Sequence, residues 1–514
     1  MLARVFSACL TGVEAALVRV EVDVSHGLPS FATVGLPDPA VRESRDRVRT
    51  ALCNSGFAFP KDRRITVNLA PADLRKEGVS FDLPIALGLL AAAGAVRAER
   101  LAGLLVAGEL TLDGGIHPVR GVLPIALAAG RAKLAGCLLA PASAAEAAVV
   151  EGLVAYPVAS LAEAAAFLNG ERAVDPVQID PERLLDAARA DDGDFADVRG
   201  QAHVKRGLEV AAAGGHNVLL AGPPGTGKTM LARRLRTILP PLTLAEALEV
   251  TTVWSVAGHR PASGLVTERP FRAPHHTTSD AGLIGGGRGP HPGEVSLAHH
   301  GVLFLDELPE FRAHVLETLR QPLEDGVVAV ARAGGSVTFP AEFQLVGATN
   351  LCRRGCPTLD ACACSPGERG AYLGRLSGPL LDRIDVFLDV PPVPYRDLEA
   401  ADPTAESSGA IRRRVVEARE RQRARFGRGR VRVNSRMTPR QTARHGVLSA
   451  EGRRLMGRAV DRLGLSARAH QRVLKVARTI ADLAGAADIG LEHLAEALQY
   501  RGLDQRPGAR LTLY

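Results

Sequence analysis

The chain has 514 residues, 46% of them hydrophobic, and a formal net charge of +7, so its length allows roughly three or four domains with cores of their own. No apolar run approaches the roughly 18 residues that a membrane-spanning helix needs. Met1–Thr11 has one Arg and only short apolar stretches, with Glu14 soon after, which makes it a poor signal or transit peptide. These features predict a cytoplasmic protein with no membrane partner.

The N-terminal part of the chain alternates strand-like runs with helices rich in Ala and Leu. This alternation predicts an α/β domain over residues 1–172. The acidic, proline-punctuated stretch Asp175–Asp194 indicates a linker over residues 173–196. The predicted strands are Val18–Val24, Ile65–Leu69, Leu104–Leu110 and Cys137–Ala140.

A glycine-rich loop follows an apolar strand pattern at His216–Ala221 and precedes a helix pattern at Lys228–Leu239. A GxxxxGK[ST] loop in this setting turns backbone N–H groups toward phosphates. Lys228 would reach the β- and γ-phosphates of ATP, and the Thr229 hydroxyl would bind Mg²⁺. The predicted nucleotide-binding residues are Gly222, Pro223, Pro224, Gly225, Thr226, Gly227, Lys228 and Thr229.

A second motif comes about eighty residues later, where the apolar run Val302–Leu305 ends in Asp306 and Glu307. The first carboxylate would hold Mg²⁺, and the second would polarise the attacking water. A phosphate loop followed by such a strand predicts an ATP hydrolase.

Between the two motifs, His275 and His276 stand in the stretch Arg269–Asp280. Adjacent histidines point in different directions in most backbones, so metal ligation by this pair is the less favoured interpretation. Further on, Val327–Val330 and Ser336–Phe339 flank Arg332-Ala-Gly-Gly, which predicts a β-hairpin. Val346–Thr349 is then a third buried strand, and it ends at Asn350.

Four cysteines, Cys352, Cys356, Cys362 and Cys364, lie within thirteen residues. In a reducing compartment this clustering favours a metal over disulfides. Four thiolates can close a tetrahedral zinc site, although the first pair departs from the common Cys-x₂-Cys spacing. A reactive loop without metal is the alternative. Cys9, Cys53 and Cys137 are isolated in apolar surroundings and are expected to be ordinary buried thiols.

The chain breaks again at the proline-rich stretch 391–409, and the remainder is predicted to be helical to residue 514. Residues 411–440 contain twelve Arg and two Glu. This cluster is equally consistent with a solvated helix face and with a nucleic-acid contact. Near the C-terminus, Asp488 is a candidate helix cap. It precedes an apolar stripe made of Leu491, Leu494, Ala495 and Leu498.

The order of the phosphate loop, Asp306-Glu307, Asn350, Arg383 and Arg468 resembles the layout of an AAA+ ATPase. The resemblance implies that Asn350 is a sensor that positions the hydrolytic water. It implies that Arg383 is a finger directed at the γ-phosphate of a neighbouring subunit, and that Arg468 is a second sensor on a helical lid. A finger acting between subunits implies a homo-oligomeric ring, by family habit a hexamer.

Several longer strings resemble the magnesium-chelatase-like AAA+ proteins of the ComM/YifB type, and this similarity covers essentially the whole chain. They include Arg269-Pro-Phe-Arg-Ala-Pro-His-His-Thr, Gly-Glu294-Val-Ser-Leu-Ala-His, Leu305-Asp-Glu-Leu-Pro-Glu-Phe, Arg320-Gln-Pro-Leu-Glu-Asp-Gly and Leu376-Ser-Gly-Pro-Leu-Leu-Asp-Arg.

This resemblance implies three parts: a Lon-protease-like (ribosomal S5-type) α/β domain over 1–172, an AAA+ α/β core over 197–394, and an all-helical lid over 395–514. It also implies a hexameric DNA motor that drives branch migration during uptake and recombination of incoming DNA. The hairpin would then face the pore of the ring, where Arg332 could contact nucleic acid.

The Lon-like resemblance places Ser80, in Lys76-Glu-Gly-Val-Ser80, where that fold carries its nucleophile. The matching base would fall near Pro118-Val-Arg120, where this chain has Arg instead of Lys. Arg stays protonated and cannot act as a general base. A binding or assembly role is therefore expected for this domain rather than peptidase activity.

Two other functions remain as alternatives. One is a chelatase motor that inserts Mg²⁺ into a porphyrin, which would need a partner with a DxSxS metal-adhesion motif that this chain lacks. The other is an ATP-dependent protease, which depends on Ser80 and a lysine that is missing.

Overall fold

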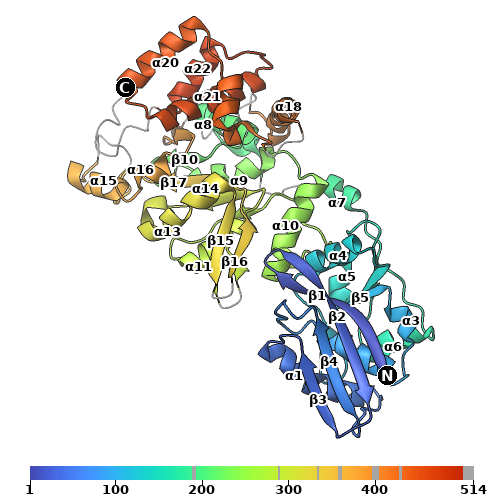
Figure 1. Cartoon of the computed structure of the whole chain (residues 1–514). Coiled ribbons are helices and arrows are strands. Elements are labelled where there is room, and N and C mark those ends of the chain that lie inside the picture. Colours follow the sequence, from blue (N-terminus) through green and yellow to red (C-terminus); the bar gives the residue numbers. More distant parts are fainter. Residues whose placement is uncertain are drawn as a thin grey trace.

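The computed structural model describes residues 1–187, 193–287, 290–332, 335–356, 362–395, 405–427 and 431–501, without the side chains of residues 331, 332 and 335. Three parts follow one another in space as in the sequence: an N-terminal α/β body, a central α/β core and a C-terminal group of helices (Figure 1). The expected α/β class with a helical C-terminal region is confirmed. Among the described helices none is both long and apolar enough to span a membrane.

The N-terminal body is built on a seven-stranded sheet with the order β3-β4-β2-β1-β5-β8-β9. The long hairpin β1–β2 and the β2–β4 pair are antiparallel, and the other neighbours are parallel. Val18, Val20 and Val22, at alternate positions of β2, are buried, as expected for a strand with one face on a core. The strands are β1 (Leu2–Thr11), β2 (Glu14–Ser25), β3 (Ser30–Val34), β4 (Arg64–Ala70), β5 (Leu104–Val106), β8 (Gly136–Leu139) and β9 (Val154–Pro157), with a small separate pair β6 (Glu109–Leu110) and β7 (Ile116–His117).

Helices cover this sheet, and α2 is buried along its whole length because it is apolar on every side. Their bounds are α1 (Pro39–Asn54), α2 (Asp82–Ala92), α3 (Ala98–Leu101), α4 (Val122–Arg131), α5 (Pro141–Ala147) and α6 (Leu161–Asn169). The range expected to be a linker contains a further helix, α7 (Pro181–Ala187). Leu184 and Leu185 of α7 pack against a small apolar cluster shared with the core, so this stretch is partly structured.

The central core has a fully parallel five-stranded sheet with the order β11-β14-β17-β10-β18. Because both faces of such a sheet are covered, its strands are continuous apolar runs. The sheet strands are β10 (Val218–Ala221), β11 (Phe271–Arg272), β14 (Val302–Leu305), β17 (Gln344–Thr349) and β18 (Val386–Asp389). The helices of the core are α8 (Ala202–Gly214), α9 (Lys228–Ile238), α10 (Leu244–Ala257), α11 (Asp280–Ile284), α12 (Glu294–Leu297), α13 (Ala313–Thr318), α14 (Arg320–Asp325), α15 (Pro366–Leu373) and α16 (Gly378–Leu381).

The predicted hairpin is confirmed as β15 (Val327–Arg332) and β16 (Gly335–Pro340). Each strand is two residues longer than the pattern indicated. It extends from the core beside the N-terminal body (Figure 1). A Cβ added at Gly12, in the β1–β2 turn, would lie 2.8 Å from Val337 Cγ1. The turn of the N-terminal body is therefore in close contact with the hairpin. A second short pair joins β12 (Gly285–Gly286) to β13 (His291–Pro292).

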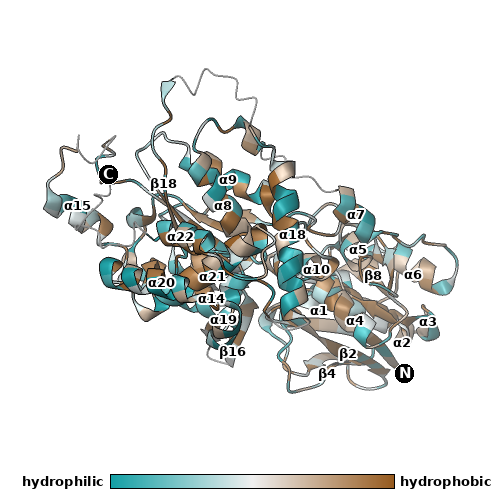
Figure 2. Cartoon of the chain, turned by 90° about the horizontal axis from the view of Figure 1, so that it is seen from above, coloured by the Kyte–Doolittle hydropathy of each residue, from teal (hydrophilic) through white to brown (hydrophobic). Residues whose placement is uncertain are grey.

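Helix α10 joins the N-terminal body to the core, and both views place it at their junction (Figures 1 and 2). Gly121 N donates to Ser255 O near the end of α10 over 3.0 Å. The buried Glu146 carboxylate accepts from Leu123 N over 2.9 Å. Apolar side chains from both sides form one cluster there: Leu123, Val149, Leu242, Ala247 and Leu265.

The C-terminal helices pack on α8 and α9 of the core and share its apolar cluster. Figure 2 shows hydrophilic and hydrophobic residues alternating along α18 and α20, as in amphipathic helices. Asp488 is not the cap of the last helix as expected: Gly490 occupies the N-cap position, and its N–H donates to His493 Nδ1 over 2.9 Å. The bounds are α18 (Ser408–Phe426), α19 (Pro439–His445), α20 (Ala450–Leu463), α21 (Ala467–Leu483) and α22 (Leu491–Gln499).

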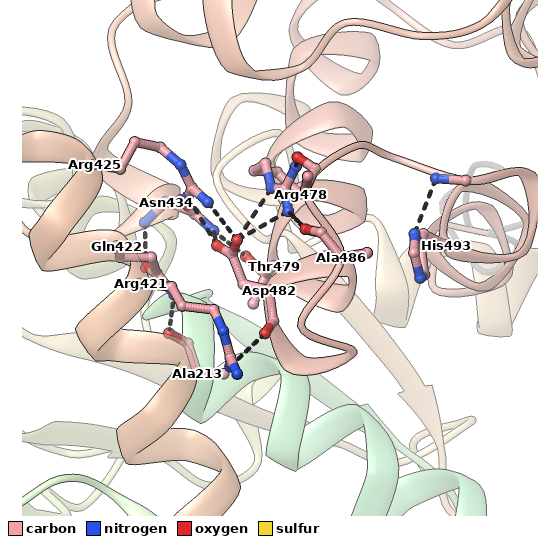
Figure 3. A network of polar contacts seen from close by, with 12 residues as sticks. Ala213, Arg421, Gln422, Arg425, Asn434, Arg478, Thr479, Asp482, Ala486 and His493 are labelled. Atoms are coloured by element: carbon pink, nitrogen blue, oxygen red, sulfur yellow. Dashed lines mark hydrogen bonds and ion pairs between the residues drawn. The ribbon is translucent and has the colours of Figure 1, made fainter.

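A buried carboxylate, Asp482 of α21, holds this region together (Figure 3). Arg425 of α18 and Asn434 both donate to its Oδ2 over 2.8 Å. Arg478, one turn earlier on α21, donates to Oδ1 over 3.2 Å. Since Asp482 is fully buried, its charge is balanced by the two guanidinium groups and not by water.

We expect Asp482→Asn to lower the free energy of unfolding of this region by about 3–5 kcal/mol, because two guanidinium groups lose their counter-charge inside the protein. The thermal unfolding midpoint, followed by circular dichroism, measures this loss. Asp488→Asn is the matched control, since Asp488 is exposed and its replacement should change stability by less than about 0.5 kcal/mol. Equal midpoints for the two variants would contradict the assigned role.

Candidate active site

Three strands of the core sheet end at the same edge, and each delivers part of the site. Strand β17 lies between β10 and β14, with Ala221 opposite Thr349 and Leu305 opposite Gly347. Because parallel strands place their carboxyl ends together, the loops after β10, β14 and β17 meet. These loops are the glycine-rich loop, Asp306-Glu307 and Asn350, so the structure brings together the residues that the motifs singled out.

The glycine-rich loop has the backbone that phosphate binding needs. Gly225 and Gly227 adopt positive φ angles of 78° and 87°, which side-chain-bearing residues rarely adopt. A Cβ at Gly225 would meet nothing within 4 Å, so the space beside this glycine is open. Gly222 instead approaches Val390, whose carbonyl oxygen would lie 2.3 Å from an added Cβ.

Lys228 begins α9 and is buried beneath the loop. Its Nζ donates to the carbonyls of Gly222 and Pro223 over 2.8 and 2.7 Å, and to Asn350 Oδ1 over 3.0 Å. Burial lowers the pKa of the Lys228 ammonium group, and the nearby carboxylates of Asp306 and Glu307 oppose that effect. The contact with Asn350 joins the phosphate loop directly to the end of β17.

Thr229 and Asp306 fit a magnesium ion. The Thr229 hydroxyl donates to Asp306 Oδ2 over 2.7 Å, although 77 residues separate the two. A hydroxyl and a carboxylate both offer oxygen atoms, the ligands that Mg²⁺ prefers. In nucleotide sites Mg²⁺ is usually held by one or two carboxylates together with the phosphates of the substrate. Asp306 Oδ1 accepts from Glu307 N over 2.9 Å, which holds this carboxylate in one orientation.

Glu307 is half exposed at the same edge and has a positive φ angle of 49°. Its carboxylate lies 3.9 Å from His276 Nδ1, and the His276 ring meets the ring of Phe311 edge-on. Sequence reasoning set His275 and His276 aside as poor metal ligands and did not predict this contact. His275 instead has its Nδ1 2.9 Å from the Thr277 hydroxyl.

The four cysteines of the 352–364 segment come together just beyond Asn350. Their sulfur atoms all lie within 4.8 Å of one another. Cys352 and Cys364 are buried, whereas Cys356 and Cys362 are partly exposed. Cys53 departs from expectation, because it is exposed, whereas Cys9 and Cys137 are buried as expected.

A second group that resembles a metal site contains Glu249, His299 and His300. His299 Nδ1 accepts from Glu342 N over 3.0 Å, so Nε2 carries the proton and donates to Glu249 over 3.2 Å. A protonated nitrogen cannot ligate a metal. These hydrogen bonds hold the pKa of the Glu249 carboxyl well below its usual range and join α10 to the segment before β14.

The arginines predicted for catalysis lie apart from the phosphate loop. Arg383 is 5% exposed, and its guanidinium pairs with Glu324 of α14 and donates to Pro379 O. Its Nε has no hydrogen-bond partner among the described residues. Burial and the nearby Arg320, Arg468 and Arg472 lower the pKa of Arg383. Arg468 is exposed in the first turn of α21.

Most described arginines of the 411–440 cluster make contacts within the chain. Arg414 pairs with Glu209, Arg419 donates to Ala212 O, and Arg436 donates to Leu323 O. Of the ten described arginines, six are exposed, so a solvated helix face and a nucleic-acid contact both stay open as interpretations: Arg412, Arg413, Arg421, Arg423, Arg432 and Arg440. The side chain of Arg332 lies outside the described residues.

Lys76 and Arg120, from the two segments considered for peptidase activity, make contacts of their own. Lys76 is buried, and its Nζ donates to Pro71 O. Arg120 lies across the junction, where its Nε would be 3.1 Å from a Cβ added at Gly258, just after α10. Arg120 is thus part of the contact between the N-terminal body and the core.

Comparison with known proteins covers nearly the full chain. Family models of the magnesium chelatase subunit ChlI match residues 194–398 and 20–143, and a model of its C-terminal part matches residues 405–501. The competence protein ComM of Haemophilus influenzae is 45% identical over 98% of both chains. An uncharacterized YifB protein of Salmonella typhimurium is 44% identical, also over 98% of both.

A more distant relative is the magnesium-chelatase 38 kDa subunit of Rhodobacter capsulatus, which is 28% identical over 44% of this chain and 69% of its own length. The similarity to ComM and YifB covers nearly the whole chain, whereas the similarity to the chelatase subunit covers less than half of it. The chain belongs to the ComM/YifB family of magnesium-chelatase-like AAA+ ATPases.

Proposed function

We propose that this chain is an ATP-driven DNA motor, a branch-migration helicase that acts in the recombination of incoming DNA. One observation supports the ATP hydrolysis that would drive the motor. Lys228 is bonded to Asn350, and Thr229 to Asp306, at one edge of the core sheet. The full-length similarity to a competence protein supports the link to incoming DNA. The division into parts at residues 1–172, 173–196, 197–394 and 395–514 belongs to the same proposal.

In this proposal the residues of the sheet edge divide the work of ATP hydrolysis. Lys228 exchanges its bonds to the Gly222 and Pro223 carbonyls for bonds to phosphate oxygens. Thr229 and Asp306 hold Mg²⁺, which neutralises phosphate charge when bound. Glu307 orients and polarises the attacking water, and Asn350 positions it from the end of β17.

Arg383 is proposed to act on the nucleotide of a neighbouring subunit in a ring, with Arg468 as a second sensor. The surroundings of Arg383 support this role. Arg383, Arg320 and Arg472 each pair with a carboxylate, on Glu324, Glu317 and Asp385 respectively. Arg468 adds a further positive charge near Arg383, so a phosphate group approaching from another subunit would meet several guanidinium groups at once. The ion pair between Arg383 and Glu324 must open before the Arg383 guanidinium can reach the phosphate of the neighbouring subunit.

The DNA contact is proposed for the β15–β16 hairpin, through Arg332, with exposed arginines of α18 such as Arg412 and Arg413 as further phosphate contacts. The N-terminal body contacts the same hairpin through its β1–β2 turn at Gly12. We propose that this body takes part in binding or assembly and that it is not a peptidase.

The four cysteines are proposed to bind one Zn²⁺ ion. Zinc–thiolate bonds of about 2.3 Å place the sulfurs of a tetrahedral site about 3.8 Å apart. The four sulfurs already lie within 4.8 Å of one another, so a small contraction closes the site. Metal analysis of protein purified without chelators should find about one zinc per chain, and a metal-free protein would leave the reactive-loop alternative.

A chelatase motor is the second candidate, favoured by the family models and by the Rhodobacter relative. It shares the ATPase chemistry and differs in the client, which would be a porphyrin-handling protein partner instead of DNA.

Substitution of Lys228 and substitution of Glu307 should impair ATP hydrolysis in different ways. Lys228→Ala should abolish turnover because phosphate binding is lost. Glu307→Gln should bind ATP as the wild type does and hydrolyse it at least about 10²-fold more slowly, since only the base is removed. Nucleotide binding and phosphate release, measured separately, distinguish the two. Glu310→Gln is the nearby carboxylate control, and an equal defect there would contradict the role of Glu307.

The trans role of Arg383 is tested with the pair Arg383→Ala and Glu324→Gln. The first variant should form rings that hydrolyse ATP roughly 10³-fold more slowly, whereas the second frees the guanidinium and should retain turnover. Rings mixed from Arg383→Ala and Lys228→Ala chains should recover part of the activity, because each chain supplies what its neighbour lacks. No recovery in mixed rings, with similar losses in both single variants, would indicate a structural ion pair.

The motor is tested by ATP hydrolysis with single-stranded, duplex and four-way-junction DNA, with Lys228→Ala as the blank. We expect stimulation by DNA that weakens steeply as salt rises, because phosphate contacts release counterions. The ranking of the three substrates shows which structure the motor acts on. Robust hydrolysis that is indifferent to every DNA would reject the DNA proposal and favour the chelatase-type client.

A further inference from the structure

The cysteine segment touches the glycine-rich loop. Gly355, between Cys352 and Cys356, has a φ angle of +67°, and a Cβ added to it would lie 3.0 Å from Pro224 Cγ and 3.4 Å from Cδ. Pro224 is part of the predicted phosphate-binding loop. Glycine therefore suits this position for two reasons, the left-handed backbone and the close approach to the proline ring.

The cysteines shape the turn that makes this contact. Gly355 N donates to Cys352 O over 3.2 Å, and Cys356 N donates to Cys352 Sγ over 3.3 Å. Between the end of β17 at Thr349 and the start of α15 at Pro366, the described residues form no helix or strand. A segment without regular structure is held by few backbone hydrogen bonds, so a bound metal would contribute much of its order.

Both ends of the segment are attached to the catalytic edge. On one side, Asn350 accepts from Lys228 and stands two residues before Cys352. On the other side, Tyr372 of α15 is buried with its hydroxyl near Thr349, the last residue of β17. The thiol cluster is thus enclosed between the phosphate loop, the end of β17 and α15.

We propose that a zinc ion bound by Cys352, Cys356, Cys362 and Cys364 clamps Gly355 against Pro224 and so sets the conformation of the phosphate loop that binds ATP. The metal site is then part of the nucleotide site rather than a separate structural knuckle, and loss of the ion weakens nucleotide binding. This inference rests on the zinc assignment in the proposed function and is independent of the DNA client.

Two variants separate the metal from the contact. Cys356→Ser removes one ligand, and Gly355→Ala leaves the ligands in place but forces the turn away from Pro224. Zinc content is measured by mass spectrometry, and affinity by titration of the full chain with a fluorescent ATP analogue. Circular dichroism reports folding. Cys53→Ser, an exposed thiol of the N-terminal body, is the control.

We expect about one zinc per wild-type chain and none in Cys356→Ser. Nucleotide affinity should fall at least about tenfold, or 1.4 kcal/mol, in Cys356→Ser and in wild-type protein stripped by a chelator. Re-addition of Zn²⁺ should restore affinity only to the stripped wild type. Gly355→Ala should keep its zinc and still bind the nucleotide more weakly, while Cys53→Ser matches the wild type.

Normal affinity in both folded variants would overturn the clamp and leave the zinc assignment intact. If Cys356→Ser does not fold, Gly355→Ala alone decides the same question. A wild type that is purified without zinc and still binds the nucleotide normally would overturn both the metal assignment and the clamp, and normal binding by the stripped wild type would overturn the clamp alone. None of these results bears on stimulation of hydrolysis by DNA.

Discussion

The register of the parallel core sheet is the constraint on which the rest of the molecule depends. Val346 of β17 pairs with Val218 on one side and with Phe304 on the other. This register brings the ends of β10, β14 and β17 to one edge, where a loop of backbone donors, a pair of carboxylates and an amide face one another. A shift of one residue in β10 or β14 would separate Thr229 from Asp306 and would move the side chains of that strand to the opposite face of the sheet.

Buried charges attach the C-terminal helices to this sheet. Asp385, just before β18, accepts from Arg472 of α21 and from Asn217 N next to β10. Complete burial would raise the pKa of this carboxyl, but the charge of Arg472 outweighs burial and holds the pKa far below its usual range. Farther along α21, Asp482 attaches α18 by accepting a hydrogen bond from Arg425 (Figure 3). Arg414 and Arg419 of the arginine-rich segment also bond to α8 of the core.

Two further contacts connect the edge of the core sheet that carries the candidate site to the rest of the chain. His276, from the loop after β11, lies beside Glu307. Glu249 of α10 is joined to His299 and His300 before β14, and α10 also carries the N-terminal body. Helix α10 thus links the N-terminal body, through hydrogen bonds, to the segment just before the strand that ends at Asp306 and Glu307.

The sequence by itself determined the elements whose chemistry is local. The glycine-rich loop, the apolar run ending in Asp306-Glu307, the hairpin and the cysteine cluster each follow from side chains close together in the chain, because turns, strands and ligand spacings are short-range properties. The assignment to the ComM/YifB family also came from contiguous strings, and the comparisons confirm it. The catalytic roles of these residues remain predictions.

Only the tertiary structure decided the contacts between distant residues. These contacts join residues from different elements. Examples are the ion pair of Arg383 with Glu324, the contact of His276 with Glu307, and the bonds that Arg414, Arg419 and Arg425 make within the chain. Charge counts and periodicity carry no information about which long side chains meet. For the same reason the sequence could not show that Gly355 touches Pro224: that contact depends on how the loop after β17 folds back over the loop after β10.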